Sequence, residues 1–154
     1  MPVRVQQGAF DIGAEIDRLR AGRTSVGAVA SFLGVMRDFN EDSDVQAMVL
    51  EHYPGMTERA LEAIVAEAGE RWPLIDALVV HRVGELRPAD PIVLVVTLSA
   101  HREAALAACA FIMDFLKTRA PFWKKERTAD GDRWVEARAS DDVAADRWQG
   151  GGGA

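Results

Sequence analysis

The sequence has one cysteine, Cys109, and no apolar run approaching the roughly 18 residues that a membrane-spanning helix needs. A single thiol excludes a disulfide within the chain and a metal site made of several cysteines. Cys109 lies in an apolar stretch, so we expect a buried thiol with a packing role. The N-terminal residues contain no long apolar core, and a cytoplasmic protein therefore fits best.

Histidine is also scarce. The three histidines, His52, His81 and His101, are scattered along the sequence among residues that are not metal ligands. We therefore expect neither a metal ion nor a cofactor. His52 precedes a strand-to-helix turn and is expected to be structural, and His81 is expected to be a strand residue without a functional role.

The charge of the chain is acidic overall but basic in one place. There are 24 Asp and Glu residues against 18 Lys and Arg, which argues against general binding to nucleic acid or to an anionic membrane. In residues 117–127, however, five cationic side chains stand beside one carboxylate, Glu126. Such a cationic island attracts anions, and its crowded ammonium groups lower one another's pKa toward the range of a neutral, nucleophilic lysine. A solvated helix end would carry similar charges, so charge alone leaves both readings open.

Hydrophobic periodicity predicts one domain of strands and helices in mixed order. We expect residues 1–148 to form this domain and the Gly-rich residues 149–154 to be a flexible tail. The expected strands are 3–6, 25–36, 45–53, 75–83 and 91–99. The expected helices are a short one capped by Asp11, then 56–71, about 101–119 and 141–148. The expected C-terminal hairpin is formed by 122–127 and 133–137. This order indicates an α+β fold rather than a doubly wound parallel sheet.

Two local features complete this prediction. Ser99 has the side chain of a helix cap and is expected to cap the helix over 101–119. Residues 41–44 have no apolar anchor and are expected to form a mobile loop.

Four segments stand out by their specific residues rather than by their pattern. They are Gly34-Val35-Met36-Arg37 with Asn40, Leu50-Glu51-His52-Tyr53-Pro54-Gly55-Met56, Ser99-Ala100-His101-Arg102, and Leu116 to Glu126. Together these segments resemble the MoaE family, the large subunit of molybdopterin synthase. The resemblance runs from about Val26 to Trp148 and includes the segment Gly131 to Val135.

The resemblance implies an α/β hammerhead fold with a mixed sheet, two main helices and a C-terminal β-hairpin. It also implies a homodimer that binds a small ubiquitin-like sulfur carrier at each end, giving a heterotetramer. In that family the C-terminal Gly-Gly thiocarboxylate of the carrier donates sulfur to cyclic pyranopterin monophosphate. Two such transfers make the dithiolene of molybdopterin, so the resemblance implies a sulfurtransferase of molybdenum cofactor biosynthesis.

The family's functional residues match positions in this sequence. The catalytic lysines match Lys117, the expected central catalyst, and Lys124, expected to stabilise negative charge and orient the thiocarboxylate. Whether Lys117 forms a covalent adduct stays open. The positions expected to bind substrate are Val35, Met36, Arg37, His101, Arg102, Lys117, Lys124, Lys125 and Glu126. Guanidinium groups and an imidazole suit a phosphate ligand.

Other readings remain possible from the residues alone. Arg37 could be a surface ion-pair partner, His101 could simply occupy a first helical turn, and Trp123 could be a packed aromatic or could stack on a pterin. At the level of function, the alternatives are a silent scaffold that binds the carrier protein, or a sensor of phosphate ligands or small RNA. The Gly-rich tail ends in Ala154, which differs from the terminus of a sulfur carrier.

Overall fold

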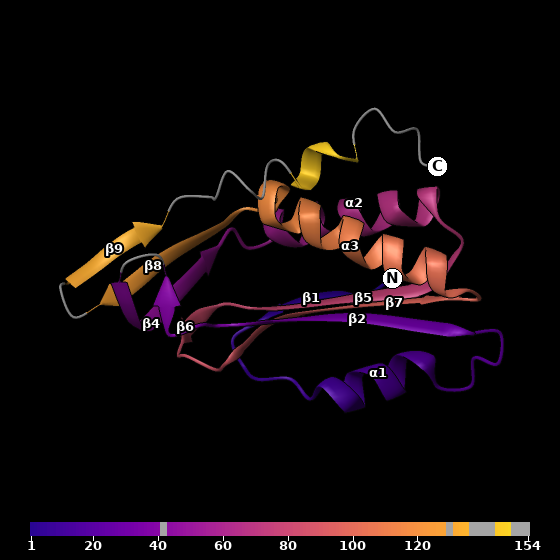
Figure 1. Ribbon diagram of the computed structural model, residues 1–154, viewed down its shortest axis with the longest axis horizontal. Helices are drawn as coiled ribbons and strands as arrows, with labels where there is room; N and C mark the ends of the chain where they lie inside the picture. Colours follow the sequence, from indigo (N-terminus) through magenta and orange to yellow (C-terminus); the bar gives the residue numbers. More distant parts are fainter. Residues whose placement is uncertain (41–42, 129–130, 136–143, 149–154) are drawn as a thin grey trace.

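The computed structural model describes residues 1–40, 43–128, 131–135 and 144–148 and shows a mixed α+β fold built on two sheets (Figure 1). The predicted fold class is confirmed. In chain order the elements are β1 (Val3–Gln6), α1 (Ile12–Arg20), β2 (Ala28–Val35), β3 (Phe39–Asn40), β4 (Ser43–His52), α2 (Met56–Arg71), β5 (Leu74–Arg82), β6 (Gly84–Leu86), β7 (Pro91–Ser99), α3 (Arg102–Arg119), β8 (Phe122–Thr128) and β9 (Gly131–Val135).

The larger sheet has the strand order β1-β5-β7-β2. β1 is parallel to β5, and the other neighbours are antiparallel. Helices α2 and α3 cover one face of this sheet and α1 covers the other (Figure 1). Because successive strand residues point to opposite faces, Ala77 and Val79 pack in the core under α2 and α3, whereas Leu78 and Val80 pack toward α1.

Helix α1 forms where the sequence predicts it. The Asp11 carboxylate accepts a hydrogen bond from the Ala14 backbone N–H at 2.9 Å, which satisfies one of the free donors of the first turn. Ile12, Ile16 and Leu19 pack against the sheet. These contacts make α1 an integral layer of the domain.

Helix α3 buries the predicted stripe of Ala105, Cys109, Ile112 and Leu116. Burial raises the pKa of the Cys109 thiol to about 11, so the expectation of a buried packing thiol is confirmed.

The start of α3 differs from the prediction. The residue before the helix is His101, with no side-chain cap hydrogen bond. Ser99 is still part of β7, and its hydroxyl donates to the Pro73 carbonyl oxygen at 2.9 Å. The prediction that Ser99 caps the helix was wrong, because Ser99 is the last residue of β7 and its hydroxyl is bonded to Pro73.

The smaller sheet has the order β3-β4-β8-β9, with β6 also paired to β4. The predicted C-terminal hairpin is confirmed as β8 and β9. The strands β3 and β6 were not predicted. Ser43 and Asp44 belong to β4, where they pair with Asn40 and Phe39, so the predicted loop over 41–44 was wrong for these two residues.

Several sequence predictions fall outside the described residues. They concern residues 41–42 of the loop, 136–137 of the hairpin, 141–143 of the last helix, and the tail 149–154. Residues 144–146 form one helical turn. Within the described part of the chain, no helix is long and apolar enough to cross a membrane.

A second, smaller core joins the two sheets. Its buried residues are Met36, Met48, Leu50, Val83 and Leu86. Phe122, the first residue of β8, packs against this core and also against the main core. The end of the molecule that carries the smaller sheet is therefore fixed to the rest by shared apolar contacts.

We expect Gly27→Ala to destabilise the protein by about 2 kcal/mol, because a Cβ at Gly27 would overlap the Ala100 carbonyl oxygen. Gly8→Ala is the matched control, since no other atom lies within 4 Å of a Cβ there. Urea unfolding of the two variants measures the difference. Equal midpoints would show that the backbone at Ala100 can move at little cost.

Candidate functional site

Lys117 and Lys124 lie on either side of one change in secondary structure. Lys117 is in the last turn of α3, and Pro121 follows the helix, where the missing N–H and the fixed φ of proline prevent its continuation. The Phe122 N–H donates to the Ala120 carbonyl at 2.9 Å, which tightens the turn into β8. The buried Thr57 hydroxyl donates to the Pro121 carbonyl at 3.1 Å and ties this turn to α2.

Strand β8 separates the cations of the sequence onto two faces. By the alternation of a strand, Phe122, Lys124 and Glu126 share one face. Lys125 lies on the opposite face, where its Nζ is 5.9 Å from the ring centroid of Trp134 on β9. Glu126 is 4% exposed. Lys125 and Glu126, both expected to bind substrate, thus lie on opposite faces of the strand.

Part of the cationic island is neutralised locally. Arg119 forms an ion pair with Glu67 of α2 at 2.7 Å, and its guanidinium lies 5.1 Å from the Phe115 ring centroid. This arginine therefore fastens α3 to α2.

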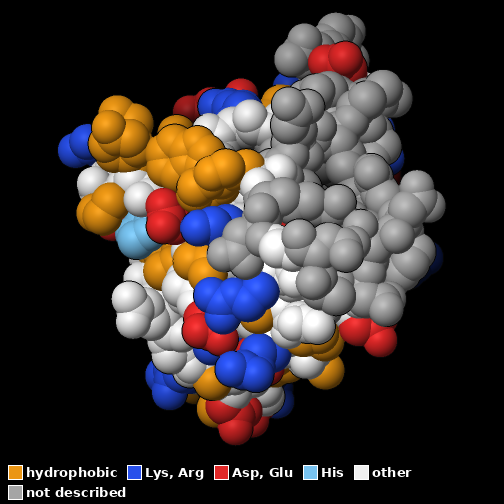
Figure 2. Space-filling model, turned by 90° about the vertical axis from the view of Figure 1, so that its left-hand side faces the viewer, with side chains coloured by type: hydrophobic (Ala, Val, Ile, Leu, Met, Phe, Trp, Pro, Cys, Tyr) orange, Lys and Arg blue, Asp and Glu red, His pale blue; other side chains and the backbone are white. Residues whose placement is uncertain are grey.

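Figure 2 shows this end of the molecule, where Lys and Arg side chains form a row beside a hydrophobic group. Exposed aromatic residues at this end include Tyr53, Trp123 and Trp134.

A buried histidine lies beside the two lysines. His81, on β5, is 5% exposed, and its ring stacks on Phe122 with centroids 3.9 Å apart and planes at 19°. Its Nδ1 is 2.8 Å from the Arg82 carbonyl oxygen. A carbonyl only accepts, so Nδ1 carries the hydrogen and Nε2 an electron pair in the neutral ring.

The electrostatics of His81 tie the lysines to one place. The pKa of His81 is lowered to about 3, mainly by burial; the hydrogen bond to Arg82 opposes this shift, and the charges of Lys117, Lys124 and His52 add to it. The charges of both lysines therefore reach the same buried His81 ring, although one lysine comes from a helix and the other from a strand. We call this group of Lys117, Lys124 and His81 the lysine end.

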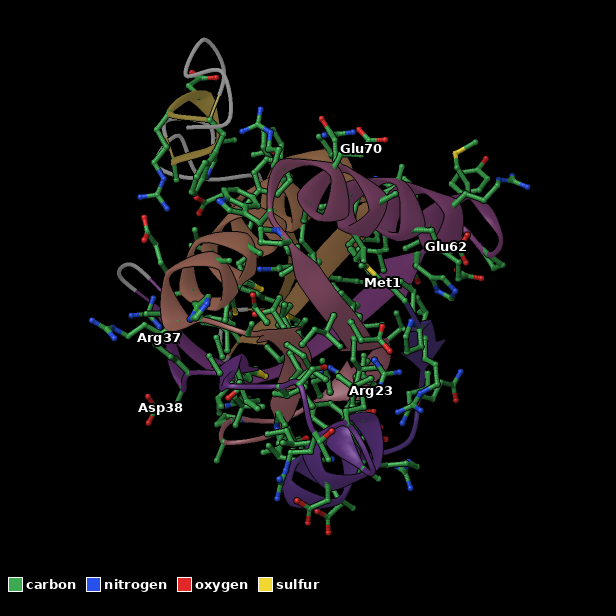
Figure 3. The ribbon with its side chains drawn as sticks, turned by 90° about the vertical axis from the view of Figure 1, so that its right-hand side faces the viewer. Met1, Arg23, Arg37, Asp38, Glu62 and Glu70 are labelled. Carbon is green, nitrogen blue, oxygen red and sulfur yellow. The ribbon has the colours of Figure 1, made fainter. Side chains whose placement is uncertain are left out.

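The segment Val35 to Arg37 approaches the lysine end from β2. Met36 is buried in the small core with Leu50, next to Phe122, and its N–H donates to the Asp90 carbonyl at 3.0 Å. Val35 is 44% exposed, and Arg37 is exposed. Figure 3 shows Arg37 and Asp38 at the rim of the molecule, pointing away from its body.

His101 and Arg102 lie at the other end of α3. Together with Glu103 and Leu106 they line an open pocket of about 530 Å³. A helix rises about 1.5 Å per residue, so His101 lies about 24 Å along the axis from Lys117. One copy of the chain thus holds the expected site residues in two groups, one at each end of α3.

Three residues near the lysine end were not expected to contribute to it: His81, His52 and Thr57. His52 is partly buried, and its Nε2 lies 4.0 Å from Glu58 Oε1. A histidine within an otherwise apolar strand was the available signal for His81. Within the residues that the structure describes, no group of three or more His, Cys, Asp or Glu side chains is placed to hold a metal ion.

Comparison with known proteins gives consistent matches over almost the whole chain. The model of the family described as MoaE protein matches residues 5–119. The molybdopterin synthase catalytic subunit of Ralstonia nicotianae is 64% identical over 146 residues, which are 95% of this chain and 83% of that protein. The protein of the same name from Pseudomonas aeruginosa is 59% identical over 149 residues, 97% of this chain and 99% of that protein.

The fold agrees with a solved structure as well. The molybdopterin biosynthesis MoaE protein from Burkholderia ambifaria has a TM-score of 0.83 and 57% sequence identity, covering 96% of this chain and 97% of that one. The likeness therefore includes both sheets and not only the helices of the core.

His81 makes a specific contribution to the pH dependence of stability. The folded chain binds the His81 proton only near pH 3, whereas the unfolded chain binds it near pH 6.5. Between these values the unfolded state holds more protons, so stability falls as the pH falls. From pH 8 to pH 5 this group alone should lower the free energy of unfolding by about 2 kcal/mol.

Urea unfolding of the wild type and of His81→Phe at pH 8 and pH 5 measures this contribution. The change in free energy between the two pH values should be smaller in the variant by that amount. Any constant loss of stability in the variant cancels in the comparison. An identical pH dependence in both proteins would contradict the assignment.

Proposed function

The chain belongs to the MoaE family, and from this membership and the geometry of the lysine end we propose that it transfers sulfur as the catalytic subunit of a molybdopterin synthase. The donor is the C-terminal thiocarboxylate of a small ubiquitin-like subunit, and the acceptor is cyclic pyranopterin monophosphate. Two transfers build the dithiolene of molybdopterin. As an enzyme, the protein is then a sulfurtransferase.

One observation carries this proposal: Lys117 and Lys124 both lower the pKa of the buried His81, although the two lysines lie on different elements. Donor and acceptor are both anions, so their approach needs fixed positive charge in a partly desolvated site. The Pro121 turn holds the helix end and the strand in a defined relation. We assign central catalysis to Lys117 and the orientation of the thiocarboxylate to Lys124.

The phosphate of the acceptor is assigned to Arg37, His101 and Arg102. Guanidinium groups offer paired donors to phosphate oxygens, and the imidazole adds one directed hydrogen bond. Val35 and Met36 accompany Arg37 on the approach from β2. Lys125 and Glu126 are assigned to the substrate-binding segment of β8, one on each face of the strand.

A dimer reconciles these assignments with the length of α3. Because about 24 Å separates His101 from Lys117 along the helix, one copy cannot bring both to a single small substrate. We propose that each site takes its lysines from one protomer and His101 and Arg102 from the other. With one small subunit at each site, the assembly is a heterotetramer.

The cytoplasmic location expected from the sequence stays a prediction. Its test is fractionation of cells that make the protein from its own gene, with detection by antibody. Recovery with the membrane or periplasmic fraction would contradict it.

We expect Lys117→Ala to lower dithiolene formation by at least about 100-fold and Lys124→Ala by about 10-fold or more, because each removes a positive charge from the reacting groups. The assay mixes the chain with the thiocarboxylated small subunit and pyranopterin phosphate, and it quantifies the dithiolene product. Arg20→Ala is the control, since it removes an exposed cation paired with Asp17 on α1.

Affinity for the small subunit separates catalysis from binding alone. We expect Lys117→Ala to bind it as the wild type does while product is lost. Absence of product from the wild-type chain, with the small subunit still bound, would favour a silent scaffold. Full activity of Lys117→Ala would remove this residue from the catalytic role.

Shared sites predict complementation between two inactive variants. A heterodimer of Lys117→Ala and Arg102→Ala contains one site with both residues intact if the site is built from two protomers. We expect about half of the wild-type activity from such a heterodimer, isolated with two different affinity tags, and little from either homodimer. An inactive heterodimer would mean that each site uses a single protomer.

A further inference from the structure

His81 is a buried titratable side chain to which the proposed reaction gives no role. Its ring is held at two points, by the stack on Phe122 at 3.9 Å and by the hydrogen bond from Nδ1 to the Arg82 carbonyl oxygen at 2.8 Å. Strand β5 itself is central in the larger sheet, between β1 and β7. The ring is thus a rigid projection of the main sheet.

Phe122 lies between the two lysines in the sequence and bridges the two cores in space. It follows Lys117 by five residues and precedes Lys124 by two, on the same face of β8 as Lys124. It contacts the main core and the small core at once. A displacement of Phe122 would therefore shift the start of β8, and with it Lys124, relative to the end of α3.

We propose that His81 is a positioning residue that fixes the separation of Lys117 and Lys124 through its stack on Phe122. This inference rests on the proposed function, because the separation matters only if both lysines act on one substrate. A misplacement of about 1 Å of a reacting group can cost about 100-fold in rate. The stack is a direct contact between β5 and the segment that links the lysines.

The surroundings of His81 suit this role because the ring stays uncharged. The charged groups that act on it are Lys117, Lys124 and His52, all of which disfavour a proton on Nε2. A third fixed cation here would repel both lysines. A neutral aromatic ring supports Phe122 without changing the charge of the site, so phenylalanine should replace it in part.

The test compares His81→Ala with His81→Phe in the complete enzyme with the thiocarboxylated small subunit. We expect kcat to fall at least about 10-fold in His81→Ala, with KM for pyranopterin phosphate within about twofold. His81→Phe keeps the stack and should restore kcat to within about threefold of the wild type. Thr97→Ala is the matched control, because Thr97 is fully buried on β7 and bonds Ala105 of α3.

A second measurement does not depend on turnover. The chain has three lysines, Lys117, Lys124 and Lys125, so after reductive methylation with ¹³C-formaldehyde each gives a resolvable NMR signal. In His81→Ala the signals of Lys117 and Lys124 should move, and the signal of Lys125, on the opposite face of β8, should stay. In His81→Phe the first two should return toward their wild-type positions.

The outcomes separate this inference from the proposed function. If the wild type makes no dithiolene, the proposed function fails, and the lysine signals still decide whether His81 positions the pair. A kcat loss in His81→Ala no larger than in Thr97→Ala would overturn the inference. So would equal inactivity of His81→Phe and His81→Ala, because the nitrogen atoms and not the stack would then matter.

Discussion

The turn at Pro121 is the constraint on which the lysine end depends. It ends α3 directly after Lys117 and Arg119, and it starts β8 two residues before Lys124. The turn is held from three sides, by the Thr57 hydroxyl on the Pro121 carbonyl, by the backbone bond from Phe122 to Ala120, and by the Phe122 ring between the two cores. Six residues thus connect Lys117 to Lys124, two cations from different elements, with little conformational freedom.

Charge counts identify the cationic segment in the sequence, but they do not show how its side chains are divided in the structure. The island of residues 117–127 was recognised by its excess of cations, but its members do different work in the structure. Arg119 binds Glu67 and joins two helices, and Lys125 faces Trp134 on the outer side of β8. A strand places neighbouring residues on opposite faces, so a linear cluster in a strand cannot act as one patch.

Long periodic segments were predictable because local pattern and tertiary packing agree in them. The bounds of β1, α2 and β7 were predicted correctly, and α1 has the predicted cap. The short strands β3 and β6 were not predicted, because two or three residues are too few to show an alternating hydrophobic pattern. Their pairing with β4 is set by the rest of the fold. Ser99 does not cap α3, because its hydroxyl donates to the Pro73 carbonyl oxygen instead. No role was predicted for His81, because the ring on which it stacks, Phe122, lies 41 positions later in the sequence.

The length of α3 gives the last step toward an assembly. The 18-residue helix α3 has Arg102 at its start and Lys117 in its last turn, so it keeps these two residues at a fixed separation. A two-fold axis that is perpendicular to α3 and passes near its middle would place the start of one α3 near the end of the other, and the symmetry would form two such sites. The acidic body then directs anionic ligands toward the two basic ends. Under the assignments proposed above, the reaction requires the homodimer, because a single copy holds Lys117 and the pair of His101 and Arg102 at opposite ends of α3.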